Sequence, residues 1–199
     1  MVSIYNQNCE ENTMFFNWLK RKTARKLAAK GLYQSARTQS RDPVLYADRG
    51  VADTMDGRFD ALSLHVALLV GRLRRLGPDG VALGQSVFDC MFRDIDQTLR
   101  ETGVGDLGVP KHMKKMMKAF NGRVYAYCAA LEAQNVPALE TALARNLYRA
   151  DRMPPQGAVM TRYVFALRDA LEAHTLDDLS RGQVSLPPAA MESNYAQAV

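Results

Sequence analysis

The chain has 199 residues and a formal net charge of +5, and its composition is 47% hydrophobic and 24% charged. These values are typical of one globular domain and exclude a chain that is disordered throughout. The longest apolar run, Ala61–Val70, is far shorter than the ~20 residues that a membrane-spanning helix needs, and no secretory signal is visible near Cys9. Three cysteines without CxxC spacing indicate free thiols in a reducing compartment.

Charge is distributed unevenly along the chain. Basic residues dominate two segments, 20–41 with eight and 111–123 with five, and neither segment contains an acidic residue. The segments 42–60 and 81–110, which lie between them, each contain five acidic and two basic residues. Patches of this kind attract partners of opposite charge or pair with each other inside the fold.

The first predicted helix runs from Thr13 to about Ala29, after a flexible N-terminus at 1–12. Residues 13–30 form a basic amphipathic segment, in which three aromatic residues precede the cations: Phe15, Phe16 and Trp18. Such a segment suits a bilayer surface or an acidic partner.

Two long helices are predicted next. After Asp56-Gly57, apolar residues recur at steps of three and four and predict a helix with one buried stripe: Phe59, Leu62, Val66, Leu69, Leu73 and Leu76. Gly77-Pro78 is expected to end it, and a second helix follows from about Asp79 to Glu101. The solvent side of that second helix carries two i,i+4 pairs, Asp89–Arg93 and Asp96–Arg100.

Three further helices and a short turn complete the expected fold. They begin near Pro110 and Pro137, around Met160, and at Thr175, where Asp178 stands at capping-box spacing. The tail 182–199 is expected to be loose. No alternating pattern long enough for a strand is present. The prediction is therefore a single compact all-α domain of about six to eight helices at 31–181, without significant sheet.

The loop from Gly103 to Gly108 matches the G-x-G-x-x-G pattern and includes Gly105 and Asp106. That pattern binds a pyrophosphate when it follows a strand and opens a helix. Here a helix precedes it, and Asp106 adds negative charge, so a bent connection between helices is the favoured interpretation.

Two other patterns leave alternative functions open. Asp89, Asp94 and Asp96 would suit a small helical Mg-dependent enzyme, although a solvated, salt-bridged helix face explains them as well. Because Asp94 lies beside the apolar stripe, we expect it or Asp96 to form a buried pair with Arg58 or Arg123. A general RNA-binding protein would use the four lysines after the glycine loop: Lys111, Lys114, Lys115 and Lys118.

Three strings go beyond composition. The first is Asp56-Gly57-Arg58-Phe59-Asp60, followed by His65. The second is Phe88–Asp96, with Asp89, Asp94 and Asp96, followed by Arg100 and Glu101. The third contains Gly103, Gly105 and Asp106, then the four lysines and Gly122-Arg123. Over about Leu32–Leu171 the chain resembles the ubiquinol–cytochrome c chaperone family, particularly its compact bacterial members of the alphaproteobacterial kind.

The resemblance implies a non-enzymatic role in the assembly of respiratory complex III (cytochrome bc1), without cofactor, catalytic residue or metal ligand. The implied client is newly made cytochrome b or a similar hydrophobic membrane subunit. The implied location is the bacterial cytoplasm, with contacts to the ribosome and, peripherally, to the inner membrane, and without a transmembrane segment. The candidate partner-binding residues are Lys111, Lys114, Lys115, Lys118, Arg123, Phe15, Phe16 and Trp18.

The methionines beside the lysines can be interpreted in two ways. Met113, Met116 and Met117 could offer an adaptable apolar groove to a client helix, or they could belong to the ordinary core.

Overall fold

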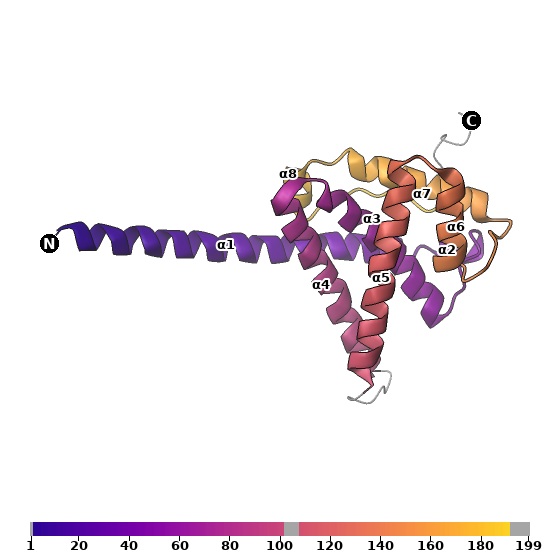
Figure 1. The fold of residues 1–199 in the computed structure, drawn as a ribbon, viewed down its shortest axis with the longest axis horizontal. Coiled ribbons are helices and arrows are strands. Elements are labelled where there is room, and N and C mark those ends of the chain that lie inside the picture. Colours follow the sequence, from indigo (N-terminus) through magenta and orange to yellow (C-terminus); the bar gives the residue numbers. More distant parts are fainter. Residues whose placement is uncertain (1, 102–107, 192–199) are drawn as a thin grey trace.

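The computed structural model describes the backbone of residues 2–101 and 108–191 and the side chains of residues 19–101 and 108–191. Within these ranges the chain forms eight helices and no strand (Figure 1). The single all-α domain is therefore confirmed for the described part of the chain. In chain order the helices are α1 (Val2–Gln39), α2 (Pro43–Ala47), α3 (Met55–Arg74), α4 (Gly77–Glu101), α5 (Val109–Glu132), α6 (Val136–Asn146), α7 (Gly157–Glu172) and α8 (Leu176–Ser180).

Helix α3 is the centre of the fold and packs against α1, α4, α5 and α7. Every residue from Ser63 to Gly71 is buried, so the predicted one-sided stripe is wrong for this part of the helix. The physical reason is the nearly continuous apolar run, because a helix that is apolar all round is covered all round. The helix ends at Arg74, earlier than predicted, and Gly77, with a φ of +81°, makes the turn into α4.

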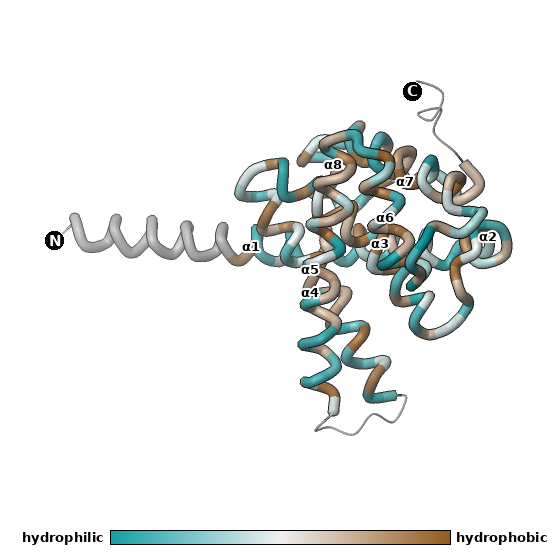
Figure 2. Tube along the Cα trace, turned by 45° about the vertical axis from the view of Figure 1, so that its right-hand side comes forward, coloured by the Kyte–Doolittle hydropathy of each residue, from teal (hydrophilic) through white to brown (hydrophobic). Residues whose placement is uncertain are grey.

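Helices α4 and α5 form a hairpin that projects below the body (Figure 2). Both helices carry a mixture of hydrophilic and hydrophobic residues along their length. The upper part of α5 packs closely on α3 because Gly71 carries no side chain. A Cβ at Gly71 would collide with the Cys128 sulfur atom. The hairpin therefore has a firmly packed root and a tip that stands away from the core.

Helix α1 is longer than the predicted 13–29 helix, since it continues to Gln39. From Ala28 onward it packs into the core, and Gly31 allows the backbone of Gly182 to pass directly over it. Figure 1 shows the N-terminal part of α1 extending away from the other helices. The flexibility expected at 1–12 stays a prediction.

The segment after α8 is held against the body at Pro187 and Ala189, which are buried, whereas Gln183, Pro188 and Met191 are exposed. The sequence predicts a loose tail from residue 182. Arg49 donates from Nη2 to the carbonyl oxygen of Ala189 at 3.0 Å, and the Ala189 amide donates to Asp42 at 3.1 Å. Gln39 donates to the carbonyl oxygen of Pro187 at 2.9 Å. The partners in these bonds are Gln39, Asp42 and Arg49, which lie far from the tail in the sequence. The composition of the tail alone therefore does not predict the bonds.

No helix among the described residues is both long enough and apolar enough to cross a membrane.

Candidate partner-binding site

The four lysines of the third string lie on the first half of α5, and all four are exposed. Pro110 occupies the first turn of this helix, and that turn contains no acidic residue. Lysines there oppose the helix macrodipole, at a cost of about 0.3–1 kcal/mol for those in the first turn. None of them forms a hydrogen bond or ion pair with another residue that the structure describes. This surface is Lys111, Lys114, Lys115 and Lys118, and it is called the lysine face below.

The methionines behind the lysine face belong mostly to the core side of α5. Met113, Met116 and Met117 are half-buried and pack against the main hydrophobic cluster. They therefore do not form an open groove, although their edges remain accessible beside the lysines.

Arg123 was expected on the binding surface, but it is buried. Its side chain is 8% exposed, and Nη2 donates to Asp60, whose side chain is fully buried, at 2.5 Å. The guanidinium also lies over the ring of Phe59, 5.3 Å from its centroid. Arg123 therefore fixes α5 to α3 and is removed from the candidate surface.

Asp60 is shared by two arginines from different parts of the chain. Besides Arg123, Arg149 donates from Nε to the other Asp60 oxygen at 2.6 Å and from Nη1 to Asp56 at 2.5 Å. Burial raises the pKa of the Asp60 carboxyl, and hydrogen bonding to Arg149 and the charge of Arg123 oppose that shift. The carboxylate thus joins α3 to α5 and to the segment that follows α6.

The rest of the first string supports the start of α3. Thr54 caps the helix by accepting a hydrogen bond from the Gly57 amide at 3.1 Å, as Ser and Thr do at helix N-termini. A Cβ at Gly57 would collide with the carbonyl oxygen of Ala52. Arg58 is exposed and pairs with Asp53 at 2.7 Å. Asp56 and Arg58 are therefore surface residues, whereas Gly57 and Asp60 are required inside.

The buried pair predicted for Asp94 or Asp96 with Arg58 or Arg123 is wrong. Asp94 accepts a hydrogen bond from the Tyr33 hydroxyl at 2.6 Å and lies 3.5 Å from the Arg37 Nε. Asp94 faces α1 because this side of α4 packs on α1, whereas Asp60 lies on α3 and pairs with Arg123 of α5.

The other carboxylates of α4 also have local partners. Asp96 pairs with Arg100 at 2.9 Å, as the i,i+4 spacing predicts. Asp89 instead accepts from Gln85 at 2.8 Å, and Glu101 accepts from Gln97 at 2.8 Å. Because each aspartate of the magnesium hypothesis is engaged separately, α4 does not bring the three together. The described residues contain no group of metal-ligating side chains that could hold a metal ion.

His65 is a buried core residue with both ring nitrogens bonded. A carbonyl oxygen only accepts, so the 2.8 Å contact to Ala61 places the proton on Nδ1. Nε2 then accepts from the Tyr163 hydroxyl at 2.9 Å, and that oxygen accepts from Gln39 at 3.1 Å. Burial lowers the pKa of His65 to about 4, so the ring is neutral at pH 7.

Several predicted residues lie outside the described part of the chain: Gly103, Gly105 and Asp106, and the side chains of Phe15, Phe16 and Trp18.

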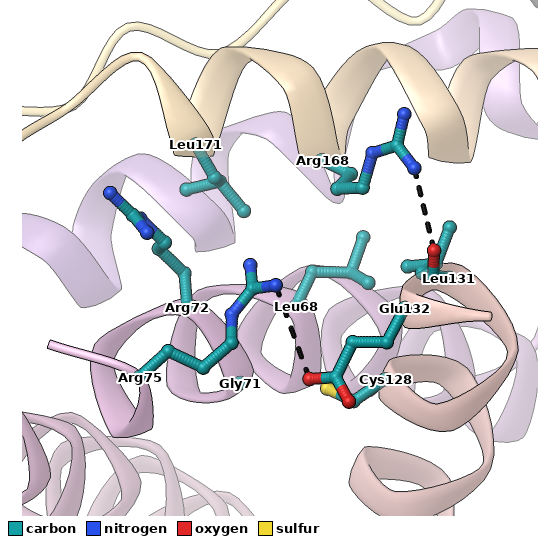
Figure 3. Close-up of a pocket in the computed structure, with 9 residues that line it drawn as sticks. All are labelled: Leu68, Gly71, Arg72, Arg75, Cys128, Leu131, Glu132, Arg168 and Leu171. Carbon is teal, nitrogen blue, oxygen red and sulfur yellow. Dashed lines mark hydrogen bonds and ion pairs between the residues drawn. The ribbon is translucent and has the colours of Figure 1, made fainter. Parts of the chain in front are cut away.

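The cavity between α3, α5 and α7 is small. Its volume is about 20 Å³, and Figure 3 shows three arginine side chains around it, Arg72, Arg75 and Arg168. Arg75 pairs with Glu132 at 4.0 Å and with Glu172 at 3.0 Å. A volume of this size holds about one water molecule, so the cavity is a packing seam and does not admit a substrate.

A family model described as ubiquinol-cytochrome C chaperone matches residues 47–186. The crystal structure of the Cbp3 homolog from Brucella abortus is similar, with a TM-score of 0.80 and 34% identity over 90% of this chain and 99% of that one. This chain belongs to the ubiquinol–cytochrome c chaperone family. No curated protein matches it.

Within the region that this chaperone family model covers, two of the motif strings meet in the fold. Asp60 of the first string and Arg123 of the third form one buried pair. These motif residues are thus structural, and the lysine face is the part of the third string that remains on the surface.

The sequence reasoning missed two residues with defined contacts and one exposed side chain. Arg149 follows α6 in a loop, with a φ of +53°, and Tyr33 lies on a stretch of α1 that was not predicted to be helical. Tyr125 is 79% exposed on α5. The steps of four and three residues between Lys111, Lys115 and Lys118 lead on to Tyr125, so the sequence could have predicted its exposure. No local pattern predicts that Arg149 pairs with Asp60.

Proposed function

We propose that the chain is a non-enzymatic assembly chaperone for respiratory complex III and that it binds newly made cytochrome b or a similar hydrophobic membrane subunit. Membership of the ubiquinol–cytochrome c chaperone family supports this role. One observation supports the lysine face as the binding surface. Its four cations are exposed and form no ion pair with another described residue.

The arrangement fits a client that is apolar and has acidic extramembrane loops. The lysines of α5 attract acidic loops, and long-range attraction of this kind speeds encounter with a charged partner. The accessible edges of Met113, Met116 and Met117 lie beside them and adapt to apolar client side chains because methionine is unbranched and flexible. The projecting hairpin presents both kinds of group away from the body.

The same proposal places the chain in the bacterial cytoplasm, at the inner membrane. The basic part of α1 supports this location, because Lys20, Arg21 and Lys26 are exposed there beside Leu27, which is 73% exposed. Cations next to apolar side chains favour the surface of an anionic bilayer. Phe15, Phe16 and Trp18 are the candidate membrane contacts, and contact with the ribosome is a further prediction for the lysine face.

The test is complementation of a strain that lacks the chain. Its membranes should lose the b- and c-type haem signals of complex III in reduced-minus-oxidised spectra, and the wild-type chain should restore them. The triple variant K114E/K115E/K118E should restore less than about a tenth of the signal while remaining folded, since these are surface changes.

The matched control is R41E/R74E/R152E, which makes the same change of charge at three exposed arginines away from α5 and from the basic part of α1. Restoration by the control variant and failure of the α5 variant support the lysine face. Equal restoration by both variants rejects the lysine face as the working surface, and a deletion strain with normal complex III rejects the proposed function. Capture of RNA without client preference, with steep salt dependence, would instead indicate the RNA-binding alternative.

A further inference from the structure

The outer side of α5 carries a straight row of exposed residues from one end to the other. Their spacing alternates between four and three residues, which is the repeat of a helix that packs along another helix. Figure 1 shows α5 on the outside of the body, in front of α3. We call this row the outer seam: Lys111, Lys115, Lys118, Gly122, Tyr125, Ala129 and Glu132.

Gly122 lies in the middle of the outer seam, and no contact with another residue that the structure describes explains it. A Cβ built at Gly122 would meet no atom within 4 Å, and its φ is not positive. Glycine in a helix interior destabilises the helix relative to alanine, because its backbone loses more freedom on folding. A Cβ at Gly71 on α3 would meet the Cys128 sulfur atom, whereas a Cβ at Gly122 would meet no described atom.

Tyr125 lies three residues further on, on the same side of α5. Its side chain is 79% exposed, the largest value among the exposed large hydrophobic residues that the structure describes. The Tyr125 ring therefore protrudes next to Gly122, where the surface of the helix has no side chain. Such a pair is suited to a second helix that crosses closely at Gly122 and covers the ring.

Charge determines which helix fits. The first half of the seam is basic, with Lys111, Lys115 and Lys118, and Lys114 flanks it. We propose that the outer seam docks an acidic amphipathic helix of a partner protein, as part of the assembly role proposed above, on which this inference rests. The seam spans about 30 Å at 1.5 Å per residue, so the partner helix needs roughly five to six turns to cover it.

The first experiment uses Gly122→Ala and Gly122→Leu in the full chain. Both substitutions remove a helix-destabilising glycine from an exposed position, so both variants should melt at or above the wild-type temperature. Both should lower complex III in the complemented strain, Leu more than Ala and by about tenfold, because the added side chain separates the two helices. Ala138→Leu, which adds leucine at an exposed position on α6, is the control.

If both Gly122 variants restore complex III fully while the deletion strain lacks it, the inference is overturned and the proposed function stands. A deletion strain with normal complex III overturns the proposed function. The second experiment covers that case, because it does not depend on complex III.

The second experiment places a photoreactive amino acid at Asn121, which is exposed and flanks the seam. Irradiation of living cells should crosslink it to a protein peptide that mass spectrometry identifies as acidic and amphipathic, and Gly122→Leu in the same chain should reduce the yield about tenfold. The same amino acid at Ala138 should give no such adduct. An adduct with a second copy of this chain, with lipid or with RNA, or no adduct at all, overturns the proposal.

Discussion

Replacement of Asp60 by Ala should destabilise the protein by about 3–5 kcal/mol, the usual cost of removing one partner of a buried ion pair. The Asp60 side chain is fully buried and accepts from Arg123 at 2.5 Å and from Arg149 at 2.6 Å. Without it, Arg123 keeps only the carbonyl oxygen of Asn146, at 3.3 Å, while its guanidinium stays buried. Arg149 is 49% exposed and is solvated by water instead, so it adds at most about 1 kcal/mol.

The assay is urea unfolding followed by far-UV circular dichroism, with thermal melts alongside. A loss of 3–5 kcal/mol corresponds to a melting temperature about 6–20 °C lower for a chain of this size. Asp56→Ala is the matched control, because Asp56 also pairs with Arg149 but is 69% exposed, and it should cost less than about 1 kcal/mol. The double variant Asp60→Ala/Arg123→Met should recover part of the loss, since no buried charge is left unpaired. If Asp60→Ala and Asp56→Ala have equal stability, the reasoning about Asp60 is refuted.

Three other predictions follow from buried groups and close contacts. The pKa of His65 is about 4 in the folded chain and 6.5 when unfolded, so below pH 6.5 the unfolded chain binds more protons and folding weakens. His65 should contribute a loss of about 3 kcal/mol between pH 6.5 and 4, and His65→Gln should show a shallower slope in urea titrations at each pH. Gly57→Ala should cost about 1–3 kcal/mol through its backbone collision, whereas Gly122→Ala should gain about 0.5–1 kcal/mol; equal melting temperatures would contradict the packing argument. Tyr33→Phe should cost about 1–2 kcal/mol, and a double-mutant cycle with Asp94→Ala should show that the two losses are not additive.

The helices were predictable because their signals are local. Apolar residues three and four apart, proline in the first turns of α5 and α6, and the Thr175–Asp178 capping box all act within a few residues of the chain. The sequence also predicts the exposure of the lysine face, since charged residues gather there without acidic neighbours in sequence.

The choice of the buried carboxylate could not be predicted in this way. Asp60 and Asp94 both stand beside apolar residues, yet Asp60 is fully buried and Asp94 is 31% exposed. What separates them is the position of Arg123 and Arg149, which reach Asp60 only after α5 has packed against α3 and α6 against α5. Helical periodicity gives the face on which a residue lies and does not give the element that covers it.

The most direct measurement is the capture of newly made cytochrome b. Cells are pulse-labelled, solubilised in mild detergent, and the tagged chain is purified together with whatever it holds. We expect labelled cytochrome b with the wild-type chain and with R41E/R74E/R152E, and at least about a tenfold loss with K114E/K115E/K118E. Equal capture by the folded α5 variant and by wild type would contradict the lysine face as the client-binding surface, and no capture by wild type would contradict cytochrome b as the client.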